Sequence, residues 1–251
     1  MNDAVFRLDG RTAVVTGSSR GIGAAVVDGL RNAGADVVGV ARSSSVVDGS
    51  RDPRRGRGTF RSVRADLSHR AESVALGERL AADAPDILVL NHGLSRRAPT
   101  AADEDDAWDA MIEVNQNSYA VIAGRVARAM AADGGGVIIM TASMLSFHGG
   151  RGVPGYAASK HAIAGLVKAM SNTWAPSGIR VNAIAPGFID TAMNGPLFAD
   201  AERSRQIFER IPLGRWGEPD DLVGAVTFLA SPAAAYITGI VLPVDGGWLA
   251  A

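Results

Sequence analysis

The sequence predicts an α/β fold, with a single domain built around a doubly wound parallel sheet that has helices on both faces. Short apolar runs recur along the 251 residues, and segments with helical periodicity lie between them. Most of the runs are apolar at nearly every position, as expected for parallel strands that are covered on both faces. Alternating strands and helices are joined by right-handed crossovers, so we expect residues 1–251 to form one domain with the Rossmann fold.

The elements alternate regularly along the chain. Six strands are expected, at Thr12–Thr16, Val37–Val40, Ile87–Leu90, Val137–Thr141, Val181–Ile184 and Ile240–Val244. Five helices are expected between them, at Gly23–Ala33, Arg70–Ala82, Ala107–Ala132, Tyr156–Trp174 and Asp220–Ala230.

Two stretches break this alternation. Ser43–Gly58 is rich in Ser, Gly and Arg, and we expect it to replace or shorten a crossover helix. Gly187–Arg215 follows a strand end late in the chain and holds a short helical segment around Asp200–Arg210. Ligands bind at the carboxyl ends of such strands, so this stretch is expected to form a substrate lid, approximately over residues 187–215.

The composition excludes several classes of function. The chain has 25 basic and 26 acidic residues, and this near balance argues against a dedicated nucleic-acid-binding protein. It has no cysteine, which excludes disulfides, zinc ribbons and thiol catalysis. The histidines show no metal-ligand spacing with carboxylates, so we expect no metal in the chemistry. They are His69, His92, His148 and His161.

Membrane association is not expected either. The first ten residues are charged and contain no apolar core of a signal peptide. Leu222–Val244 has no charged residue and is long enough to resemble a membrane span. Pro232 and Pro243 divide it, so a helix followed by a buried strand is the better interpretation. We therefore expect a cytoplasmic protein.

A glycine-rich turn, Gly17-Ser18-Ser19-Arg20-Gly21-Ile22-Gly23, directly follows the first strand and opens a helix. Glycine permits a tight turn, close approach of the backbone to a pyrophosphate and close packing of the helix on the strand. The N–H groups and the partial positive charge at the helix N-terminus attract phosphate. An ordinary strand-to-helix turn is the alternative interpretation. The residues expected to bind a dinucleotide here are Gly17, Ser19, Arg20, Gly21, Ile22 and Gly23.

Tyr156 and Lys160 lie four residues apart at the start of a predicted helix, so their side chains share one face. A free phenol has a pKa of about 10, and a nearby ammonium group stabilises the phenolate and lowers that pKa. Ser143 lies just past a strand end, at the edge of the sheet where ligands bind. Its hydroxyl could hydrogen-bond a carbonyl oxygen while Tyr156 protonates it. The three residues are therefore candidates for acid–base catalysis, although a Tyr–Lys pair alone is also typical of a surface contact.

The turn TGSSRGIG, together with Ser143, Tyr156 and Lys160 at their spacing, resembles the short-chain dehydrogenase/reductase family over essentially the whole chain. The resemblance implies transfer of a hydride between C4 of a nicotinamide and a secondary alcohol or ketone. Tyr156 would be the acid–base, Lys160 its pKa-lowering partner and ribose ligand, and Ser143 the residue that orients the carbonyl. The family's fourth catalytic residue, an asparagine that holds a relay water, falls on Asn115, with Asn117 as a nearby alternative. The resemblance also implies a homotetramer that acts on a small molecule.

Further cofactor contacts follow from the resemblance. Asp66 and Leu67 would lie at the adenine, and Asn91 and Gly93 along the adenosine. The family usually has alanine where this chain has His92, for which we expect a structural role. The nicotinamide would be bracketed by Pro186, Gly187, Ile189 and Thr191.

The residues that end the second strand bear on the choice of cofactor. NAD-specific proteins place an acid there, about 20 residues past the glycines, to hold the ribose 2′-hydroxyl. Here the position is Ala41, and Arg42 follows it. Arg20 is a second guanidinium that could hold a 2′-phosphate. We therefore expect NADP, with NAD as the alternative.

Some segments resemble the sugar-acid branch of the family more narrowly. That branch typically uses NAD, so either the substrate or the cofactor has changed in this chain. A sugar acid needs a cation for its carboxylate, and the candidates are Arg96, Arg97 and Arg151. Ser143, Met144 and His148 would contact the rest of the substrate. The segments are Leu94–Ala98, Ala142–Gly150, Arg210–Gly217 and Val244–Ala250.

Two other functions remain open. An NADPH-dependent 3-oxoacyl or polyketide ketoreductase would need a long apolar cleft under the lid. A dinucleotide-binding regulator without catalytic activity is disfavoured by the intact set of Ser143, Tyr156 and Lys160.

Overall fold

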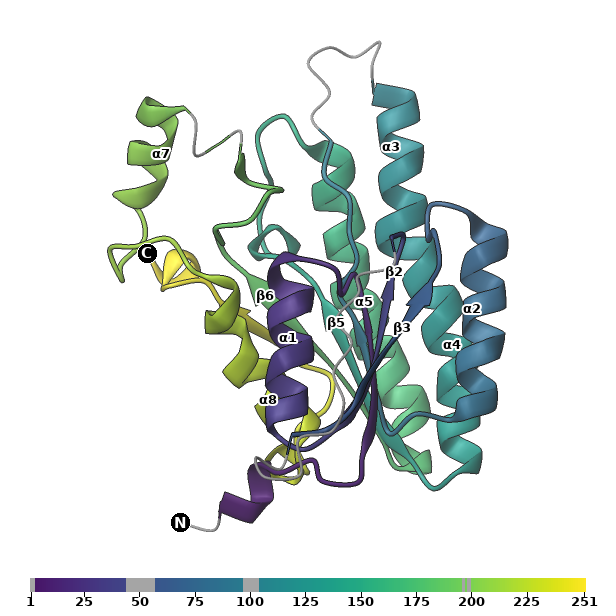
Figure 1. The fold of residues 1–251 in the computed structure, drawn as a ribbon. Helices are drawn as coiled ribbons and strands as arrows, with labels where there is room; N and C mark the ends of the chain where they lie inside the picture. The colour runs from purple at the N-terminus through teal and green to yellow at the C-terminus, as the bar shows by residue number, and fades with distance from the viewer. Residues whose placement is uncertain (1–2, 44–56, 97–103, 196, 198–199) are drawn as a thin grey trace.

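Seven parallel strands form one sheet in the order β3-β2-β1-β4-β5-β6-β7 (Figure 1). The computed structural model describes residues 3–43, 57–96, 104–195, 197 and 200–251. The strand order reverses between β1 and β4, as in doubly wound sheets, and this confirms the predicted Rossmann fold. The strands are β1 (Thr12–Thr16), β2 (Asp36–Ala41), β3 (Phe60–Arg64), β4 (Ile87–Leu90), β5 (Gly136–Thr141), β6 (Ile179–Pro186) and β7 (Val241–Val244).

All six predicted strands are present, and β3 is an additional one. In β3 only Phe60 and Val63 are buried, while the three other side chains are exposed. The strand lies at the edge of the sheet, which explains why it lacks the continuous apolar run of the central strands. Of the predicted irregular stretch Ser43–Gly58, residues 44–56 lie outside the described residues.

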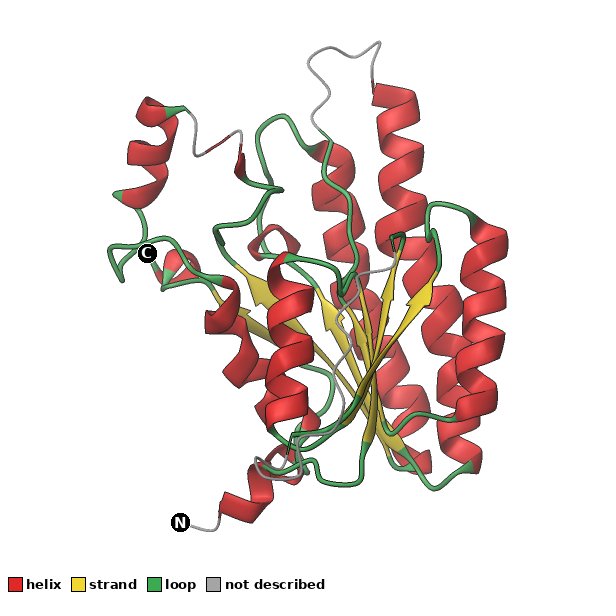
Figure 2. Ribbon diagram, in the orientation of Figure 1, coloured by secondary structure: helices red, strands yellow, loops and turns green. Residues whose placement is uncertain are grey.

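Helices cover both faces of the sheet (Figure 2). The strand β4 shows why its run is apolar throughout: Leu88 and Leu90 pack in one core, whereas Ile87 and Val89 pack in the other. The first core is shared with α2 (Arg70–Asp83), α4 (Ser118–Ala132) and α5 (Pro154–Trp174), and the second with α1 (Gly21–Asn32) and α8 (Val223–Ala230).

The predicted helix Ala107–Ala132 consists of three segments. It is divided into α3 (Glu104–Ile112), a π-helical turn (Glu113–Asn117) and α4. A π turn widens an α-helix by one residue without ending it, so the helical pattern continues through the turn. Such turns are frequent at functional sites, and this one contains Asn115.

The remaining helical segments are short. Helix α7 (Ala201–Phe208) forms where the sequence predicts one, and the carboxylate of Asp200 caps it by accepting from the Arg203 N–H at 3.0 Å. None of the helices in the described part of the chain is long and apolar enough to cross a membrane. The 3-10 turns are Asp3–Phe6, Met144–Ser146, Ala175–Ser177, Pro219–Leu222, Pro232–Ala234 and Trp248–Ala250.

The carboxyl ends of the strands meet at one edge of the sheet. Thr16, the last residue of β1, pairs with Leu90, the last residue of β4. Thr141, the last residue of β5, pairs with Ile184 near the end of β6. The segments that follow these strands therefore begin side by side, although they are far apart in the sequence.

Candidate active site

A large cavity opens along this edge, lined by the segments that follow β1 to β6, by described residues of 187–210 and by residues 248–251. Gly23 and Asn115 do not line it, and Arg97 lies outside the described residues. The predicted site residues that line it are Gly17, Ser19, Arg20, Gly21, Ile22, Arg42, Asp66, Leu67, Asn91, Gly93, Arg96, Ser143, Met144, His148, Arg151, Tyr156, Lys160, Pro186, Gly187, Ile189 and Thr191.

The glycine positions of this turn have no room for a side chain. Gly17 and Gly21 have φ angles of +70° and +54°, which favour glycine. A Cβ on Gly23 would lie 2.1 Å from the carbonyl oxygen of Gly17. A Cβ on Gly17 would lie 2.8 Å from the Cα of His92. Backbone atoms therefore form this wall of the cavity.

This turn fits the phosphates of a dinucleotide. Helix α1 begins at Gly21, and its N-cap, Arg20, makes no side-chain hydrogen bond to the first turn. The first N–H groups of a helix have no partner within the helix, so here they remain available to an anion. The backbone cradle and the helix dipole together make a site for a pyrophosphate.

Two arginine side chains line the cavity near the glycine turn. Arg20 and Arg42 are both exposed and both line the cavity, and Ala41 stands where a carboxylate is expected in an NAD site. Asp66 lies nearby, and its Oδ1 accepts from the Ser68 hydroxyl at 2.7 Å. This hydrogen bond lowers the pKa of Asp66, and the charge of Arg42 contributes to the shift.

Ser143 is held in position by the turn that it caps. Its Oγ accepts from the N–H of Leu145 at 3.1 Å, while the Oγ of Ser146 accepts from the N–H of Ser143 at 3.3 Å. The hydroxyl of Ser146 in turn donates to the carbonyl of Lys160 at 2.6 Å, which fastens the turn to α5. Because the Oγ of Ser143 already accepts one hydrogen bond, its own proton can be donated toward Tyr156 or a ligand.

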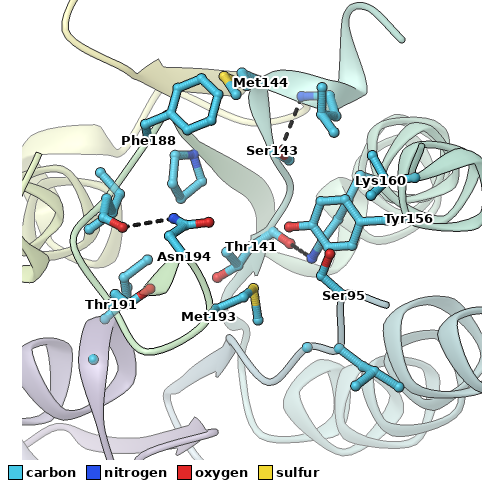
Figure 3. A pocket seen from close by; sticks show the side chains of 18 of the residues that line it. Ser95, Thr141, Ser143, Met144, Tyr156, Lys160, Phe188, Thr191, Met193 and Asn194 are labelled. Atoms are coloured by element: carbon cyan, nitrogen blue, oxygen red, sulfur yellow. Dashed lines mark hydrogen bonds between the residues drawn. The ribbon is translucent and has the colours of Figure 1, made fainter. Parts of the chain in front are cut away.

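Tyr156 and Lys160 lie one turn apart on α5, and the ring of Tyr156 points into the pocket (Figure 3). The Nζ of Lys160 lies 5.6 Å from the ring centroid of Tyr156 and donates to the carbonyl of Thr141 at 2.7 Å. Burial lowers the pKa of Lys160 to about 7. Burial also raises the pKa of Tyr156, and a hydrogen bond with Ser143 opposes that rise. The predicted lowering of the phenol pKa is therefore wrong for this structure, because loss of hydration disfavours the phenolate more than its neighbours stabilise it.

Asn115 is fully buried in the π turn and uses its whole side chain. Its Oδ1 accepts from the N–H of Leu94, and its Nδ2 donates to the carbonyl of Leu94, both at 2.8 Å. The Nδ2 also donates to the Oγ of Ser159, the residue before the lysine, at 3.1 Å. Asn117 instead donates to the carboxylate of Glu113 at 2.6 Å. Of the two asparagines, Asn115 is thus the one tied to the helix that carries the lysine.

His92 joins two elements of the site through both ring nitrogens. Its Nδ1 lies 2.7 Å from the Oγ1 of Thr16, and its Nε2 lies 2.7 Å from the Oγ of Ser118. Because Ser118 donates its own proton to the carbonyl of Val114, it accepts from Nε2–H, and Nδ1 accepts from Thr16. Burial, with a contribution from the charge of Lys160, lowers the pKa of His92 to about 3. This neutral ring agrees with the expected structural role.

Charged and apolar side chains are both exposed at the substrate end of the cavity, the apolar ones being Phe147 and Met193. Arg96 and Arg151 are exposed there, whereas Met144 is buried. His148 is half-buried, and its Nδ1 lies 2.8 Å from the carbonyl oxygen of Gly149. Among the described residues, no three His, Asp or Glu side chains are grouped as metal ligands.

The sequence did not identify several residues that line this end. Asn194 donates to the carbonyl of Ile189 at 2.7 Å and extends, with Met193, toward the middle of the pocket (Figure 3). Most of these residues lie in the irregular stretch after β6, where no period shows which side chains face the cavity. Arg210 and Trp248 do lie in the segments that resemble the sugar-acid branch, and this was the available signal. The residues are Ser95, Phe188, Met193, Asn194, Leu197, Arg203, Gln206, Arg210 and Trp248.

The chain is similar to known enzymes over nearly its whole length. Residues 17–249 match a family model described as enoyl-(acyl carrier protein) reductase. The 2-dehydro-3-deoxy-D-gluconate 5-dehydrogenase of Pseudoalteromonas atlantica is 48% identical over 248 residues, which are 97% of this chain and 98% of that protein.

Solved structures have the same fold. An NADP-bound structure from Beutenbergia cavernae superposes with a TM-score of 0.92 at 46% identity, over 98% of this chain and 100% of that one. A gluconate 5-dehydrogenase from Burkholderia cenocepacia, solved with NADP and tartrate, superposes with a TM-score of 0.91 at 40% identity, over 99% of this chain and 98% of that one.

Proposed function

The chain belongs to the short-chain dehydrogenase/reductase family, and on that premise we propose that it is an NADP-dependent dehydrogenase of a sugar acid. As a member of the family it is an oxidoreductase that acts on a CH–OH group with NAD(P). The observation that carries the proposal is that Ser143, Tyr156 and Lys160 line the same cavity as the glycine turn. The relatives from P. atlantica and B. cenocepacia are named as dehydrogenases of sugar acids, which supports the substrate class.

The charges near the glycine turn support NADP over NAD. Ala41 offers no carboxylate to a ribose 2′-hydroxyl, whereas Arg20 and Arg42 offer two guanidinium groups to a 2′-phosphate. The structures from B. cavernae and B. cenocepacia contain NADP. The bound nicotinamide supplies or accepts the hydride. The other proposed cofactor contacts are Gly17, Ser19, Gly21, Ile22, Gly23, Asp66, Leu67, Asn91, Gly93, Tyr156, Lys160, Pro186, Gly187, Ile189 and Thr191.

Tyr156 is the proposed acid–base. Its raised pKa keeps the phenol protonated at neutral pH, so its proton is available to a ketone oxygen in the direction of reduction. In the direction of oxidation the phenol must lose this proton, and a charged Lys160 favours the loss because a cation stabilises the phenolate. Ser143 donates its hydroxyl proton to the substrate oxygen, and Asn115 organises the relay of protons between the lysine and solvent.

A sugar acid suits the rim of the cavity better than an acyl thioester does. The exposed guanidinium groups of Arg96 and Arg151 favour a ligand with a carboxylate, whereas a 3-oxoacyl chain calls for an apolar cleft. Met144 and His148 are the other proposed substrate contacts. The stretch 187–215 is the proposed lid, supported by Phe188, Asn194 and other residues of this stretch that line the cavity.

A spectrophotometric screen tests the substrate class and the cofactor together. Sugar acids, polyols and β-ketoacyl esters are each offered with NADP and with NAD. The expected result is oxidation of at least one sugar acid with NADP at a higher kcat/KM than with NAD. Turnover of β-ketoacyl esters alone would contradict the proposed substrate.

Tyr156→Phe tests the mechanism, because it removes only the phenolic hydroxyl. Turnover is expected to fall at least ~100-fold, since general acid–base catalysis contributes ~10²–10⁴-fold. Binding of NADPH, followed by its fluorescence, is expected to stay close to that of the wild type. The matched control is Tyr119→Phe. The ring centroid of Tyr119 lies 5.6 Å from the Lys160 Nζ, as that of Tyr156 does, but Tyr119 does not line the cavity. Undiminished turnover in Tyr156→Phe would contradict the mechanism.

We further propose that the protein is a cytoplasmic homotetramer. The family resemblance supports this assembly, and Trp108, Leu213 and Tyr236 are exposed apolar side chains that contacts between copies would cover. Light scattering is expected to give a mass near four times the 25.9 kDa of the chain, and a monomer mass would contradict the assembly. Cell fractionation is expected to recover the protein with cytoplasmic enzymes.

A further inference from the structure

Helix α7 and the turn after it bring charged residues of both signs to the cavity. Arg205 forms ion pairs with Glu202 at 3.0 Å and with Glu209 at 2.6 Å, so its own charge is balanced within the helix and the turn that follows it. Arg203 and Arg210 line the cavity, and so do Asp200 and Glu202. The helix lies apart from the sheet and beside the C-terminal segment (Figure 1).

Arg210 is held by an aromatic side chain. Its Cζ lies over the ring of Trp248, 4.1 Å from the centroid. Trp248 is itself fixed, because it is buried in one apolar cluster with Met144 and Ala157 and meets the ring of Phe188 edge-on at 4.9 Å. Met144 follows Ser143 in the sequence, and Ala157 follows Tyr156. The cluster that holds Trp248, and through it the guanidinium of Arg210, therefore also contains the sequence neighbours of both catalytic residues.

Contact with a ring face leaves the donors of a guanidinium unused. The attraction to the ring acts on the positive charge, while all five N–H groups remain available for hydrogen bonds. Within the described part of the chain, the guanidinium of Arg210 forms no ion pair or hydrogen bond. Such a group is prepared to receive two oxygens of one carboxylate.

The acidic residues near α7 are already engaged. Glu202 is paired with Arg205, and the carboxylate of Asp200 caps the helix through the N–H of Arg203. Among the described residues, neither carboxylate forms an ion pair with Arg203 or Arg210. Of these two arginines, Arg210 is the one whose head group is fixed by a buried partner.

We propose that Arg210, held over Trp248, binds the carboxylate of the substrate. This inference rests on the proposed function, since it names the residue that would select an acid from among polyhydroxy compounds. It also assigns a function to α7: when the helix and the turn after it rest on the C-terminal segment, the carboxylate site is formed beside the catalytic residues.

Titration calorimetry of the NADP-loaded full-length protein tests the assignment. The probes are D-gluconate, tartrate, and D-glucitol, which has hydroxyls but no carboxylate. Arg210→Gln is expected to raise the Kd of D-gluconate and tartrate about tenfold or more, because a charge-assisted bidentate contact is lost. The Kd of D-glucitol is expected to stay unchanged. Arg205→Gln, on the same helix but ion-paired away from the ligand, is the control and is expected to bind all three as the wild type does.

Kinetics with a sugar acid that the wild type oxidises provide a second measurement. Arg210→Gln is expected to raise KM and leave kcat within about threefold, because a contact to the carboxylate, which does not change in the reaction, stabilises ground state and transition state equally. Arg210→Lys is expected to be intermediate, since it keeps the charge and loses the paired donors.

The outcomes separate this inference from the proposed function. Wild-type affinity for the acids in Arg210→Gln, equal losses for D-gluconate and D-glucitol, or a loss found only in Arg203→Gln would each overturn the assignment to Arg210. If the wild type itself binds neither D-gluconate nor tartrate and oxidises no sugar acid, the proposed substrate class fails together with this inference.

Discussion

His92 connects the end of β1 to the first residue of α4, because Thr16 and Ser118 are its two hydrogen-bond partners. A neutral imidazole suits this position, with one nitrogen donating and the other accepting. Protonation would make both nitrogens donors, and the Oγ1 of Thr16 would have to turn its proton away. The ring therefore couples the geometry of the phosphate turn to that of the π turn, and it does so only while it is uncharged.

His92→Ala is expected to lower the free energy of unfolding by about 2–4 kcal/mol at pH 7.5, because it opens a cavity and removes one hydrogen bond from each of two buried hydroxyls. The difference in the free energy of unfolding between the wild type and His92→Ala is expected to become smaller in acid. The unfolded chain binds a proton at this histidine below its ordinary pKa of 6.5, but the folded protein binds it only near pH 3, so wild-type stability falls as pH falls through this window. Between pH 7 and pH 5 this loss is on the order of 2 kcal/mol, and the variant lacks it.

Urea unfolding at pH 7.5 and at pH 5 measures both effects. His161→Ala is the control, because His161 is exposed on α5 and, among the residues that the structure describes, bonds only the carbonyl of Ala157 within its own helix. If the difference in the free energy of unfolding between wild type and His92→Ala is the same at both pH values, the proposed role of the neutral ring is wrong.

Residue types and spacing were sufficient to predict most of the candidate site. Ser143, Tyr156 and Lys160 line one cavity as predicted from their spacing and the family resemblance. The direction of the tyrosine pKa was not predictable, because burial depends on the surrounding chain and not on residues four positions apart. The choice of Asn115 over Asn117 likewise depended on which amide faces α5.

The elements of the fold could be predicted where burial was continuous. The strand β4 is apolar at every position because both its faces are covered, whereas β3 buries only two side chains and its pattern is that of a loop. The π turn was hidden for a different reason, since one additional residue shifts the helical register without interrupting it.

The same π turn shows how a helix acquires a site. A regular α-helix bonds its own backbone groups and presents side chains at fixed angles. The widened turn brings Asn115 to the backbone of Leu94, and through that contact it fastens the segment after β4 to the catalytic helix α5. The segment after β4, which lines the cavity, is thus fixed by the π turn, although the sequence of that turn has the pattern of an ordinary helix.

Over the whole molecule, the site is built at a cost in stability. Lys160 is only 2% exposed, and its pKa of about 7 lies far below the ordinary 10.5. Between these two values the unfolded chain binds more protons than the folded protein, so the contribution of this group to stability rises with pH. Below pH 7 the charge stays buried and its full cost is present.

Lys160→Met is expected to abolish turnover and yet stabilise the cofactor-free protein by about 1 kcal/mol or more at pH 6.5, because it removes a charge that loses its hydration on burial. The stability advantage of Lys160→Met over the wild type is expected to decrease toward pH 9.5, where the wild-type lysine is neutral in the folded state. Urea unfolding at the two pH values measures this. Lys168→Met, at an exposed position of the same helix, is expected to change stability little at either pH. A less stable Lys160→Met protein at pH 6.5 would contradict the argument.

Trp248 comes late in the chain, after every described strand of the sheet, yet it belongs to one buried apolar cluster with Met144 and Ala157 from the middle of the sequence. During synthesis the glycine turn and the catalytic side chains leave the ribosome well before it. The ring that supports Arg210 and closes the apolar cluster is thus added to an almost finished domain. A nascent chain can therefore fold most of its sheet before the residues that complete its substrate pocket are available.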